Sequence, residues 1–455
     1  MKKVLIANRG EIAVRIIRAC HDLGLQTVAV YSEVDKEALH VLHADEAVCI
    51  GEGPSHQSYL KIPNILSACE VTGADAVHPG YGFLSENANF AAICESCGLT
   101  FIGPKSEAIA LLGDKAQAKA TAMSAGCPVI PGSKGVVSEL EEAQKEADKI
   151  GYPIFIKASL GGGGKGIRIA EKREDFTRHF TAAKAEAEMN YGCPDVYLEK
   201  MIVDPHHVEI QVLADQHGNT LYLGERDCTI QRRRQKLIEE GPSPILNPKL
   251  RKKMGKAAVW VAERAGYTSA GTVEFLVDKD FNFYFMEMNT RIQVEHTVTE
   301  ELVGVDLIKE QLRIARGESL ELRQKDVELK GHVIEFRINA EDSKNNFRPS
   351  PGRLEYYLPP GGPGVRVDSA CYSGYFIPPN YDAMIAKLIV KGKDREEAIQ
   401  AAKRALKEFH IGGIGTTIPF HQYMLEDKNF LESNYDISYI DRLAAEGVKF
   451  TLPSE

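Results

Sequence analysis

The sequence predicts a multidomain protein of mixed α/β and α+β class, and three observations lead to this prediction. With 455 residues, the chain exceeds the usual domain size of roughly 100–200 residues and should form two to four domains. Its first hundred residues alternate strand-like and helix-like patterns, which is typical of a parallel sheet covered by helices. The later parts contain runs of strands separated by glycine- and proline-rich turns.

The N-terminal region is expected to form a parallel α/β sheet. A helix is expected over residues 11–23, where Ile12, Ile16, Cys20 and Leu23 follow helical spacing and Gly24 ends the pattern. The turn before it has a single glycine and lacks GxGxxG, so dinucleotide binding is only weakly indicated. A second helix is expected over residues 106–125. The expected strands cover residues 4–7, 27–31, 74–78 and 100–102.

A small separate α+β lobe is expected in the middle of the chain, with helices over 139–150 and 174–189 and strands over 154–157, 167–170 and 195–202. Its first two strands flank a run of four consecutive glycines between Lys157 and Lys165. Such a loop lets backbone N–H groups approach an anion, and the lysines add positive charge. It is not a Walker A loop, because a strand follows it. The alternative is a mobile surface turn.

A predicted hairpin carries the most informative cluster of polar residues. Strands over 271–277 and 282–286, joined by a turn at 278–280, bring Glu274 roughly opposite Glu287. Asn289 shares a face with Glu287, and Arg291 joins them if the strand continues. Two carboxylates and an amide oxygen suit Mg²⁺ with bound phosphate. The alternative is a strand end with a solvated polar face.

The C-terminal region beyond Gly331 shows short strands with proline- and glycine-rich turns, followed by one strand over 384–390 and one helix over 395–409.

Net charge and cysteine content limit the functional classes. The net charge of −9 argues against a nucleic-acid-binding protein, and no apolar run approaches a membrane span. The nine scattered cysteines suit a reducing cytoplasm, where we expect the protein to reside without nucleic-acid or membrane partners.

The order of the candidate residues along the chain resembles the ATP-grasp ligases. That order is Lys115, Lys157, the glycine loop, Glu199–Ile202, Glu274, Glu287 and Asn289. Within that group, three motifs resemble biotin carboxylases, and the similarity extends from end to end of the chain: IANRGEIA at 6–13, HPGYGFLSEN at 78–87 and MNTRIQVEH at 288–296. The resemblance implies an N-terminal parallel α/β domain of pre-ATP-grasp type over 1–114, an ATP-grasp fold over 115–315 and a C-terminal mixed β domain over 331–447. Within the ATP-grasp domain, a mobile lid lobe that carries the glycine loop would cover about residues 131–202.

The resemblance also implies which residues hold the nucleotide and metal. The phosphates of ATP would contact Lys115, Lys157 and the amides of Gly163 and Gly164. The adenine would be read by the hinge residues Glu199, Lys200, Met201 and Ile202, with His207 near the ribose and phosphates and Arg234 as a further contact. Two ions of Mg²⁺ or Mn²⁺ would bind Glu274, Glu287 and Asn289.

Further residues are implied to act on bicarbonate and biotin. Bicarbonate would sit on Lys236, Arg291, Gln293 and Val294. Glu295 would be the general base, Arg337 would stabilise the biotin enolate, and Tyr81 and Gly82 would line the biotin pocket. Without the resemblance, Arg337 is better explained as an edge-strand arginine paired with Glu335.

Two positions depart from the pattern of the bacterial family. Arg234 stands where histidine is more common, and Leu160 stands where another glycine is common. The arginine-rich run at 231–236 also resembles a basic nucleic-acid patch, but the acidic residues around it favour a loop of the site.

The implied activity is ATP-dependent carboxylation of biotin on a biotin carboxyl carrier protein, with bicarbonate and through carboxyphosphate. It would be the first half-reaction of acetyl-CoA carboxylase, which feeds malonyl-CoA and fatty acid synthesis. We expect a homodimer that works with carboxyltransferase subunits. Because no Met-Lys-Met biotinylation motif or acyl-CoA-binding region is found, carrier and transferase are expected on other chains. The alternatives are a subunit of a pyruvate or propionyl-CoA carboxylase, another ATP-grasp ligase, or a non-catalytic nucleotide-binding protein.

Overall fold

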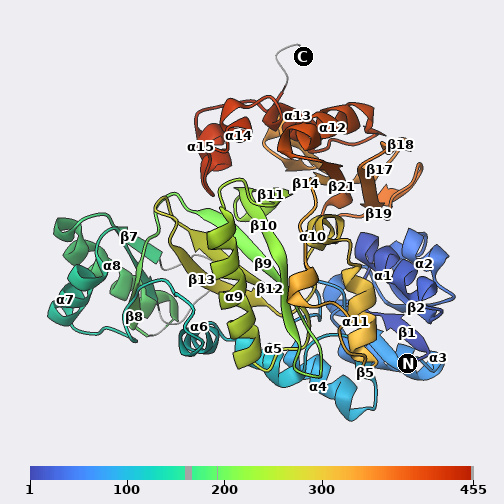
Figure 1. Cartoon of the computed structure of the whole chain (residues 1–455), viewed down its shortest axis with the longest axis horizontal. Coiled ribbons are helices and arrows are strands. Elements are labelled where there is room, and N and C mark those ends of the chain that lie inside the picture. The colour runs from blue at the N-terminus through green and yellow to red at the C-terminus, as the bar shows by residue number, and fades with distance from the viewer. Residues whose placement is uncertain (159–166, 192, 452–455) are drawn as a thin grey trace. The chain divides into compact units, whose positions relative to one another are not determined.

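The computed structural model describes residues 1–158, 167–191 and 193–451. The chain forms two compact units (Figure 1), one made of Met1–Cys127, His206–Phe275 and Glu287–Glu455, the other of Pro128–Pro205 and Leu276–Met286. The glycine run between Lys157 and Ile167, with Leu160, Gly163 and Gly164, lies outside the described residues.

The first unit begins with a five-stranded parallel sheet, which confirms the expected α/β region. Its strand order is β3-β2-β1-β4-β5. The edge strand β3 was not expected from the sequence, because half of its residues are exposed and it lacks a buried apolar run. The strands are β1 (Lys3–Ile6), β2 (Gln26–Ser32), β3 (Glu46–Gly51), β4 (Ala76–His78) and β5 (Thr100–Phe101).

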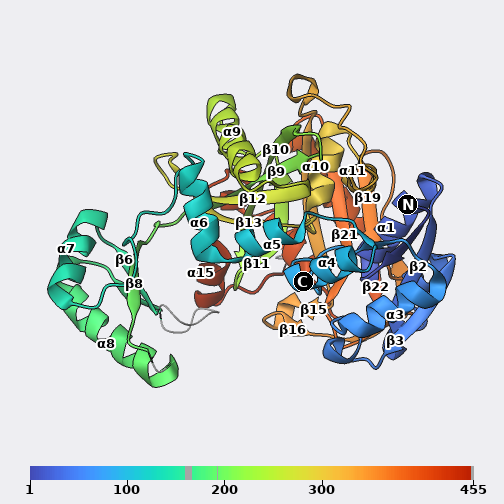
Figure 2. The same ribbon diagram turned by 90° about the horizontal axis from the view of Figure 1, so that it is seen from below.

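Helices cover both faces of this sheet (Figures 1 and 2). Val4 and Ile6 of β1 pack in the core that includes α1 and α11, whereas Leu5 of β1 and Ala7 just after it pack in the core that includes α3 and α4. This division follows from the alternation of side chains along a strand. The helices are α1 (Gly10–Asp22), α2 (Leu39–His43), α3 (Ile62–Thr72), α4 (Ala88–Ser96) and α11 (Leu307–Ala315).

The helix expected over residues 106–125 is interrupted, so that prediction was wrong in detail. Two helices are present, α5 (Ser106–Gly113) and α6 (Lys115–Ser124), and Asp114 between them has extended backbone angles. The Asp114 carboxylate accepts a hydrogen bond from the Gln117 amide at 2.8 Å and so caps α6. The break places Lys115 at the first residue of a helix.

An eight-stranded sheet forms the rest of the first unit's framework, in the order β13-β12-β9-β10-β11-β14-β21-β19. Strand β11 pairs antiparallel with β14, with Ile238 opposite Phe336, so the C-terminal strands extend the sheet begun by the middle region. The strands are β9 (His206–Ala214), β10 (Thr220–Arg232), β11 (Gln235–Gly241), β12 (Ser269–Val277), β13 (Phe283–Asn289), β14 (His332–Asn339), β19 (Val365–Ser369) and β21 (Met384–Gly392).

Short strands and helices complete the C-terminal part around a core that contains Phe336, Phe420 and Phe430. The short strands are β15 (Glu341–Asp342), β16 (Arg348–Pro349), β17 (Gly352–Arg353), β18 (Tyr356–Leu358), β20 (Phe376–Ile377) and β22 (His410–Gly412). The remaining helices of the unit are α9 (Pro248–Arg264), α10 (His296–Val303), α12 (Arg395–Glu408), α13 (Ile418–Met424), α14 (Lys428–Leu431) and α15 (Tyr439–Ala445).

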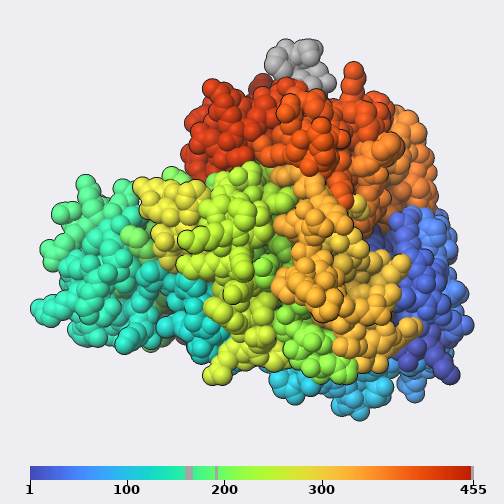
Figure 3. Space-filling view, viewed as in Figure 1, coloured from blue at the N-terminus to red at the C-terminus, as the bar shows by residue number. Residues whose placement is uncertain are grey.

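Helix α11 joins this framework to the N-terminal region. Lys309 lies 2.7 Å from Asp22, and Arg15 donates to Asp306 at 2.5 Å. In Figure 3 the gold surface of α11 and the residues after it borders the blue N-terminal residues. Among the described residues, no helix combines the length and the apolar character that crossing a membrane requires.

The second unit is a small α+β lobe, as expected. Strands β7 (Ile167–Ala170), β6 (Ile154–Ala158) and β8 (Val196–Lys200) form an antiparallel sheet in that order. Helices α7 (Leu140–Ile150) and α8 (Arg173–Tyr191) pack on it through small and aromatic residues, among them Ala143, Phe176 and Phe180.

Candidate active site

The first unit collects most of the candidate side chains from neighbouring strands and the segment after β13. Buried polar residues are costly unless they are paired, so each contact in this group bears on its stability. The side chains come from β9 (His207, Glu209), β10 (Arg226), β11 (Lys236), β12 (Glu274), β13 (Glu287, Asn289), residues 291–295 and β14 (Arg337).

Lys236 is the centre of the group. Its Nζ donates to Glu209 at 2.6 Å, to Glu295 at 2.6 Å and to Glu274 at 3.1 Å. Burial alone would lower the pKa of Lys236, but the surrounding acidic groups raise that pKa well above its usual range. The ammonium group therefore stays charged and fixes three carboxylates around one point.

Glu295 lies just before α10 and is buried, with a relative exposure of 2%. Its Oε1 accepts from Lys236, and its Oε2 accepts from Arg337 at 2.9 Å. Burial opposes ionisation, but these two cations hold the pKa of Glu295 well below its usual range. A carboxylate fixed between two cations is the kind of group that can receive a proton once a substrate anion shares those cations.

A metal ion would fit the oxygen atoms at the β12–β13 edge. Glu274 Oε1 accepts from Asn289 Nδ2 at 2.8 Å, so the two side chains are in contact. Burial raises the pKa of Glu287, and the nearby charge of Glu274 raises it further. A divalent cation would relieve that repulsion, and carboxylate and amide oxygens are the ligands that Mg²⁺ prefers. The three residues fit a hard cation.

Arg291 does not continue the strand, because β13 ends at Asn289. It bends back instead, and its Nη2 donates to Asn289 Oδ1 at 3.2 Å. Its Nε donates to Glu86 at 2.9 Å, which ties the segment to the 78–87 motif. The guanidinium thus lies next to the candidate metal ligands.

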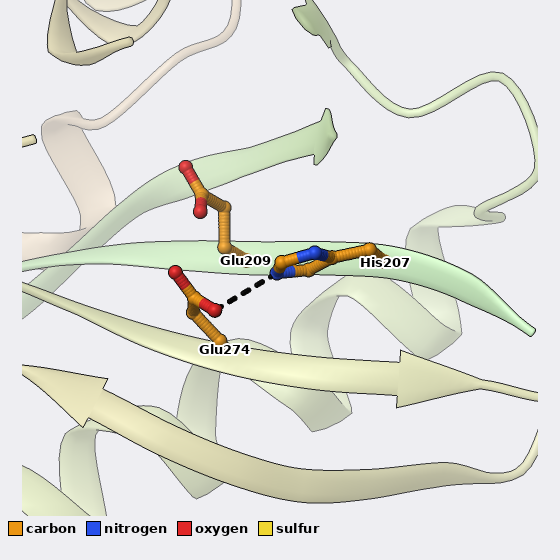
Figure 4. A group of neighbouring side chains, drawn as sticks. All are labelled: His207, Glu209 and Glu274. Carbon is orange, nitrogen blue, oxygen red and sulfur yellow. Dashed lines mark ion pairs between the residues drawn. The ribbon is translucent and has the colours of Figure 1, made fainter. Parts of the chain in front are cut away.

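His207, Glu209 and Glu274 form a group with the spacing of metal ligands (Figure 4). His207 Nε2 lies 3.0 Å from Glu274 Oε2. Both carboxylates also bind Lys236, and Glu209 binds Arg226 as well. Because cations already compensate these carboxylates, the trio is better explained as an ion-pair network than as a transition-metal site.

Arg226 is a site residue that sequence reasoning missed. It is fully buried, and its guanidinium donates to Glu209 at 2.6 Å and to Gln293 at 3.1 Å. Arg226 lies directly opposite Glu209, and this pairing is set by the register between β9 and β10. A search for buried arginine on a strand beside another charged strand would have been needed to find it.

The predicted residues Tyr81 and Gly82 also lie in the first unit. Tyr81 donates its hydroxyl hydrogen to Glu11, and Lys387 donates to the Val294 carbonyl at 2.8 Å. Lys387 also lies 3.2 Å from Glu11, so Tyr81, Glu11 and Lys387 form a chain of contacts to the backbone just before Glu295. Gly82 has a positive φ of 69° and belongs to the turn after β4.

The remaining nucleotide-binding candidates are distributed over both units. Lys115 begins α6, and its charge lowers the pKa of Glu287 after burial and Glu274 have raised it. Arg234 occupies an exposed turn with a φ of 67°. In the second unit, Lys157 forms an ion pair with Glu199, and Lys200 donates to the Tyr152 carbonyl at 2.7 Å. Met201 and Ile202 follow β8 there.

Family models match nearly the whole chain. The N-terminal domain of biotin carboxylase matches residues 1–109, the ATP-binding domain of the carbamoyl-phosphate synthase L chain matches 114–323, and the C-terminal domain of biotin carboxylase matches 335–442. The chain belongs to the biotin carboxylase family. It is accordingly an ATP-dependent ligase with the multidomain fold that the sequence predicts, and a non-catalytic nucleotide-binding protein is not supported.

Curated relatives agree with this family. The chain is 58% identical over 442 residues to biotin carboxylase 1 of Bacillus subtilis, covering 97% of this chain and 98% of the relative. It is 52% identical over 439 residues to a pyruvate carboxylase subunit of Methanothermobacter thermautotrophicus, covering 96% and 89% of the two chains. Biotin carboxylases of more than one enzyme complex are thus similar to it.

Two solved structures show the same fold. The biotin carboxylase of Campylobacter jejuni, described as a complex with a β,γ-ATP compound, superposes with a TM-score of 0.90 at 49% identity, covering 97% and 98% of the chains. The biotin carboxylase domain dimer of Hydrogenobacter thermophilus 2-oxoglutarate carboxylase superposes with a TM-score of 0.89 at 49% identity, covering 99% of each chain. That structure is described as containing MgADP, ADP and bicarbonate.

Proposed function

We propose that this chain uses ATP and bicarbonate to carboxylate biotin on a carrier protein, through carboxyphosphate. One observation carries the proposal. Glu295 lies between Lys236 and Arg337, while the same Lys236 also binds Glu274 at the candidate metal site. The proposed base, its cations and a proposed metal ligand thus form one continuous group of contacts.

The nucleotide end of the site would use Lys115, Lys157, the glycine loop and the hinge residues 199–202, with His207 and Arg234 as further contacts. Mg²⁺ or Mn²⁺ on Glu274, Glu287 and Asn289 would supply positive charge to bridged phosphates. His207 and Asn289 orient Glu274 through contacts of 3.0 and 2.8 Å. Relatives solved with an ATP compound and with MgADP support this assignment.

Bicarbonate would bind between Lys236 and Arg291, beside Gln293 and Val294. In the free enzyme two cations hold the pKa of Glu295 low, which makes it a weak base. A bound bicarbonate would share the charge of Lys236 and thereby raise the basicity of Glu295 when the proton must be removed. The deprotonated bicarbonate is then a stronger nucleophile toward the γ-phosphate.

Carboxyphosphate would release CO₂ and phosphate within the site. The phosphate would accept the N1′ proton of biotin, and the resulting enolate would capture CO₂. Arg337 would stabilise the negative charge of the enolate, and Tyr81 and Gly82 would line the biotin pocket. Buried cations stabilise developing charge more strongly than exposed cations, because water does not screen them.

Our first candidate for the complete enzyme is acetyl-CoA carboxylase, where carboxybiotin serves malonyl-CoA and fatty acid synthesis. It would act in the cytoplasm as a homodimer, with a carrier protein and carboxyltransferase subunits as partners. The dimer described for the Hydrogenobacter relative supports the oligomeric state. The similar pyruvate carboxylase subunit supports a pyruvate enzyme as the second candidate. Capture of the partner transferase would distinguish these complexes.

The test is the release of ADP from ATP by the purified chain. We expect it to require bicarbonate and to accelerate when free biotin is added, because biotin captures the CO₂ and gives its N1′ proton to the phosphate, which is then released. The same assay with an amine or amino acid replacing biotin is the control. No stimulation by biotin, together with stimulation by the control substrate, would contradict the proposal.

A further inference from the structure

Two glutamates face each other on the neighbouring strands β11 and β14, and one of them binds Arg337. Glu239 on β11 is directly opposite Glu335 on β14, and each has a relative exposure of 0%. Directly opposite side chains on antiparallel strands lie on the same face, with Cβ atoms about 4.5–5.5 Å apart. Like charges at such a position destabilise a sheet, so both glutamates are not expected to be ionised together.

Each of the two carboxyl groups has one occupied and one unoccupied oxygen. Glu239 Oε1 accepts from Arg337 Nε at 2.5 Å, and Glu335 Oε2 accepts from the Thr297 hydroxyl. The other two oxygens, Glu239 Oε2 and Glu335 Oε1, are buried and have no hydrogen-bond partner among the described residues. Leaving a buried acceptor without a donor is destabilising, so two of them on facing side chains need an explanation.

The surrounding charges show which groups influence this pair. Across the sheet Arg337 on β14 is opposite Lys387 on β21, and Lys387 is opposite Asp368 on β19. The charged and titratable groups whose fields reach one or both glutamates are Lys236 on β11, Cys228 on β10, Arg337, Lys387 and Glu295. Glu295 is thus a third acidic residue in the same region, and its charge raises the pKa of Glu239.

We propose that Glu239 and Glu335 hold one shared proton, and that this half-protonated pair positions Arg337 for its interaction with Glu295. A single O–H···O bond between the two unoccupied oxygens satisfies both at once. It also leaves one negative charge in place of two on facing strands. The inference about Arg337 rests on the proposed function, whereas the shared proton does not.

The pKa values of the two carboxyl groups agree with a shared proton. Burial raises the pKa of Glu239 to about 7, although Arg337 lowers it, and the Glu295 charge raises it further. Burial likewise raises the pKa of Glu335 to about 8, and the charge of Glu239 adds to that rise. One proton on the pair is therefore retained at neutral pH.

The shared proton affects how Arg337 divides its contacts. Arg337 donates to Glu239 through Nε and to Glu295 through Nη2 at 2.9 Å. If the pair lost its proton, a second negative charge would draw the guanidinium toward the β11–β14 side and repel Glu295. The arm of Arg337 that reaches the proposed base and the biotin enolate would then be displaced.

Infrared difference spectroscopy tests the proton without an activity assay. We expect the native protein at neutral pH to show the carbonyl band of a buried protonated carboxyl group, shifted in D₂O, and Glu335→Gln to lose it. Glu328→Gln is the matched control, since the Glu328 side chain is 75% exposed and should leave the band unchanged. Retention of the native band in Glu335→Gln would overturn the shared proton.

Kinetics with biotin tests the positioning role. We expect kcat/KM for biotin in the native enzyme to fall on the alkaline side as the pair loses its proton. Glu335→Gln should remove this alkaline limb, because its amide donates permanently to Glu239. Glu335→Ala should raise KM for biotin several-fold at all pH values. Equal profiles for Glu335→Gln and Glu335→Ala, with the infrared band lost as expected, would overturn the role of the pair while leaving its proton intact.

Discussion

Lys236 shows how one residue connects the two halves of the proposed reaction. It binds Glu274 on the metal side and Glu295 on the bicarbonate side, and it also binds Glu209. Arg226 holds Glu209 from the opposite side, through a bond of 2.6 Å. Breaking a buried ion pair by removing one partner typically costs about 3–5 kcal/mol, so these residues contribute to stability as well as chemistry.

Glu295→Gln tests the proposed base. We expect kcat for bicarbonate-dependent ADP release to fall by about 10²–10⁴-fold, the usual contribution of a positioned general base. KM for ATP should change little, because Glu295 has no role assigned in nucleotide binding. Steady-state kinetics measure both constants. Glu301→Gln, in the helix that follows Glu295 but 34% exposed, is the control, and full turnover by Glu295→Gln would remove the assignment.

Glu240 gives a prediction about pH and stability. It accepts from His332 at 2.7 Å, from Arg395 at 2.7 Å and from Tyr435 at 2.8 Å. Burial opposes ionisation, yet His332 and Arg395 lower the pKa of Glu240 to about 2, below its ordinary 4.5. Its ionised form therefore stabilises the fold above pH 4.5, and this contribution disappears as the pH falls toward about 2.

The corresponding variant is Glu240→Gln. Urea unfolding at a series of pH values should show a lower midpoint than the native protein at neutral pH and a smaller difference at acidic pH. A difference that stays constant from neutral to acidic pH would contradict the assigned electrostatic role.

At the residue scale, sequence reasoning reached those residues whose chemistry is local. The spacing of Glu287 and Asn289 on one strand and the turn that returns to Glu274 are visible in the sequence. The contacts of Arg226 and Glu239 depend on how their strands pair with other strands, and a local sequence pattern does not show this pairing. The alternative explanation of Arg337, an edge-strand arginine paired with Glu335, does not hold, since β14 is internal and Arg337 binds Glu239 and Glu295.

At the element scale, the site depends on where strands and helices end. Asn289 ends β13, Glu295 precedes α10, and Lys115 begins α6 because Asp114 breaks the preceding helix. The helical pattern of residues 106–125 was predictable, but the break was not, because helix-forming residues continue on both sides of Asp114. Polar residues thus become available at element ends, where backbone direction changes.

Helix α9 gives a prediction about packing between elements. At Gly255 an added Cβ would lie 2.5 Å from Cδ2 of Tyr222 on β10. Gly255→Ala should therefore destabilise the protein by about 1–3 kcal/mol, even though alanine favours a helix. Thermal unfolding measures the effect. Gly113→Ala is the matched control, because nothing lies within 4 Å of its Cβ, and it should be neutral or stabilising. Equal effects of the two substitutions would contradict close packing at Gly255.

At the scale of the whole molecule, one continuous sheet carries the site from β13 to β14. The N-terminal parallel sheet was predictable, because buried parallel strands form short apolar runs. The pairing of β11 with β14 was not, since about ninety residues of sequence lie between Gly241 and His332 and no turn links the two strands. This pairing places Arg337 beside Glu295, so the C-terminal part completes the site.

The most direct test of the proposed reaction follows one oxygen atom of bicarbonate. If bicarbonate attacks the γ-phosphate after Glu295 removes its proton, the C–O bond of carboxyphosphate breaks later and phosphate keeps the attacking oxygen. With ¹⁸O-labelled bicarbonate and ATP, we expect one ¹⁸O atom in each molecule of inorganic phosphate, measured by mass spectrometry. Phosphate that carries oxygen from labelled water, and none from bicarbonate, would contradict the proposed reaction.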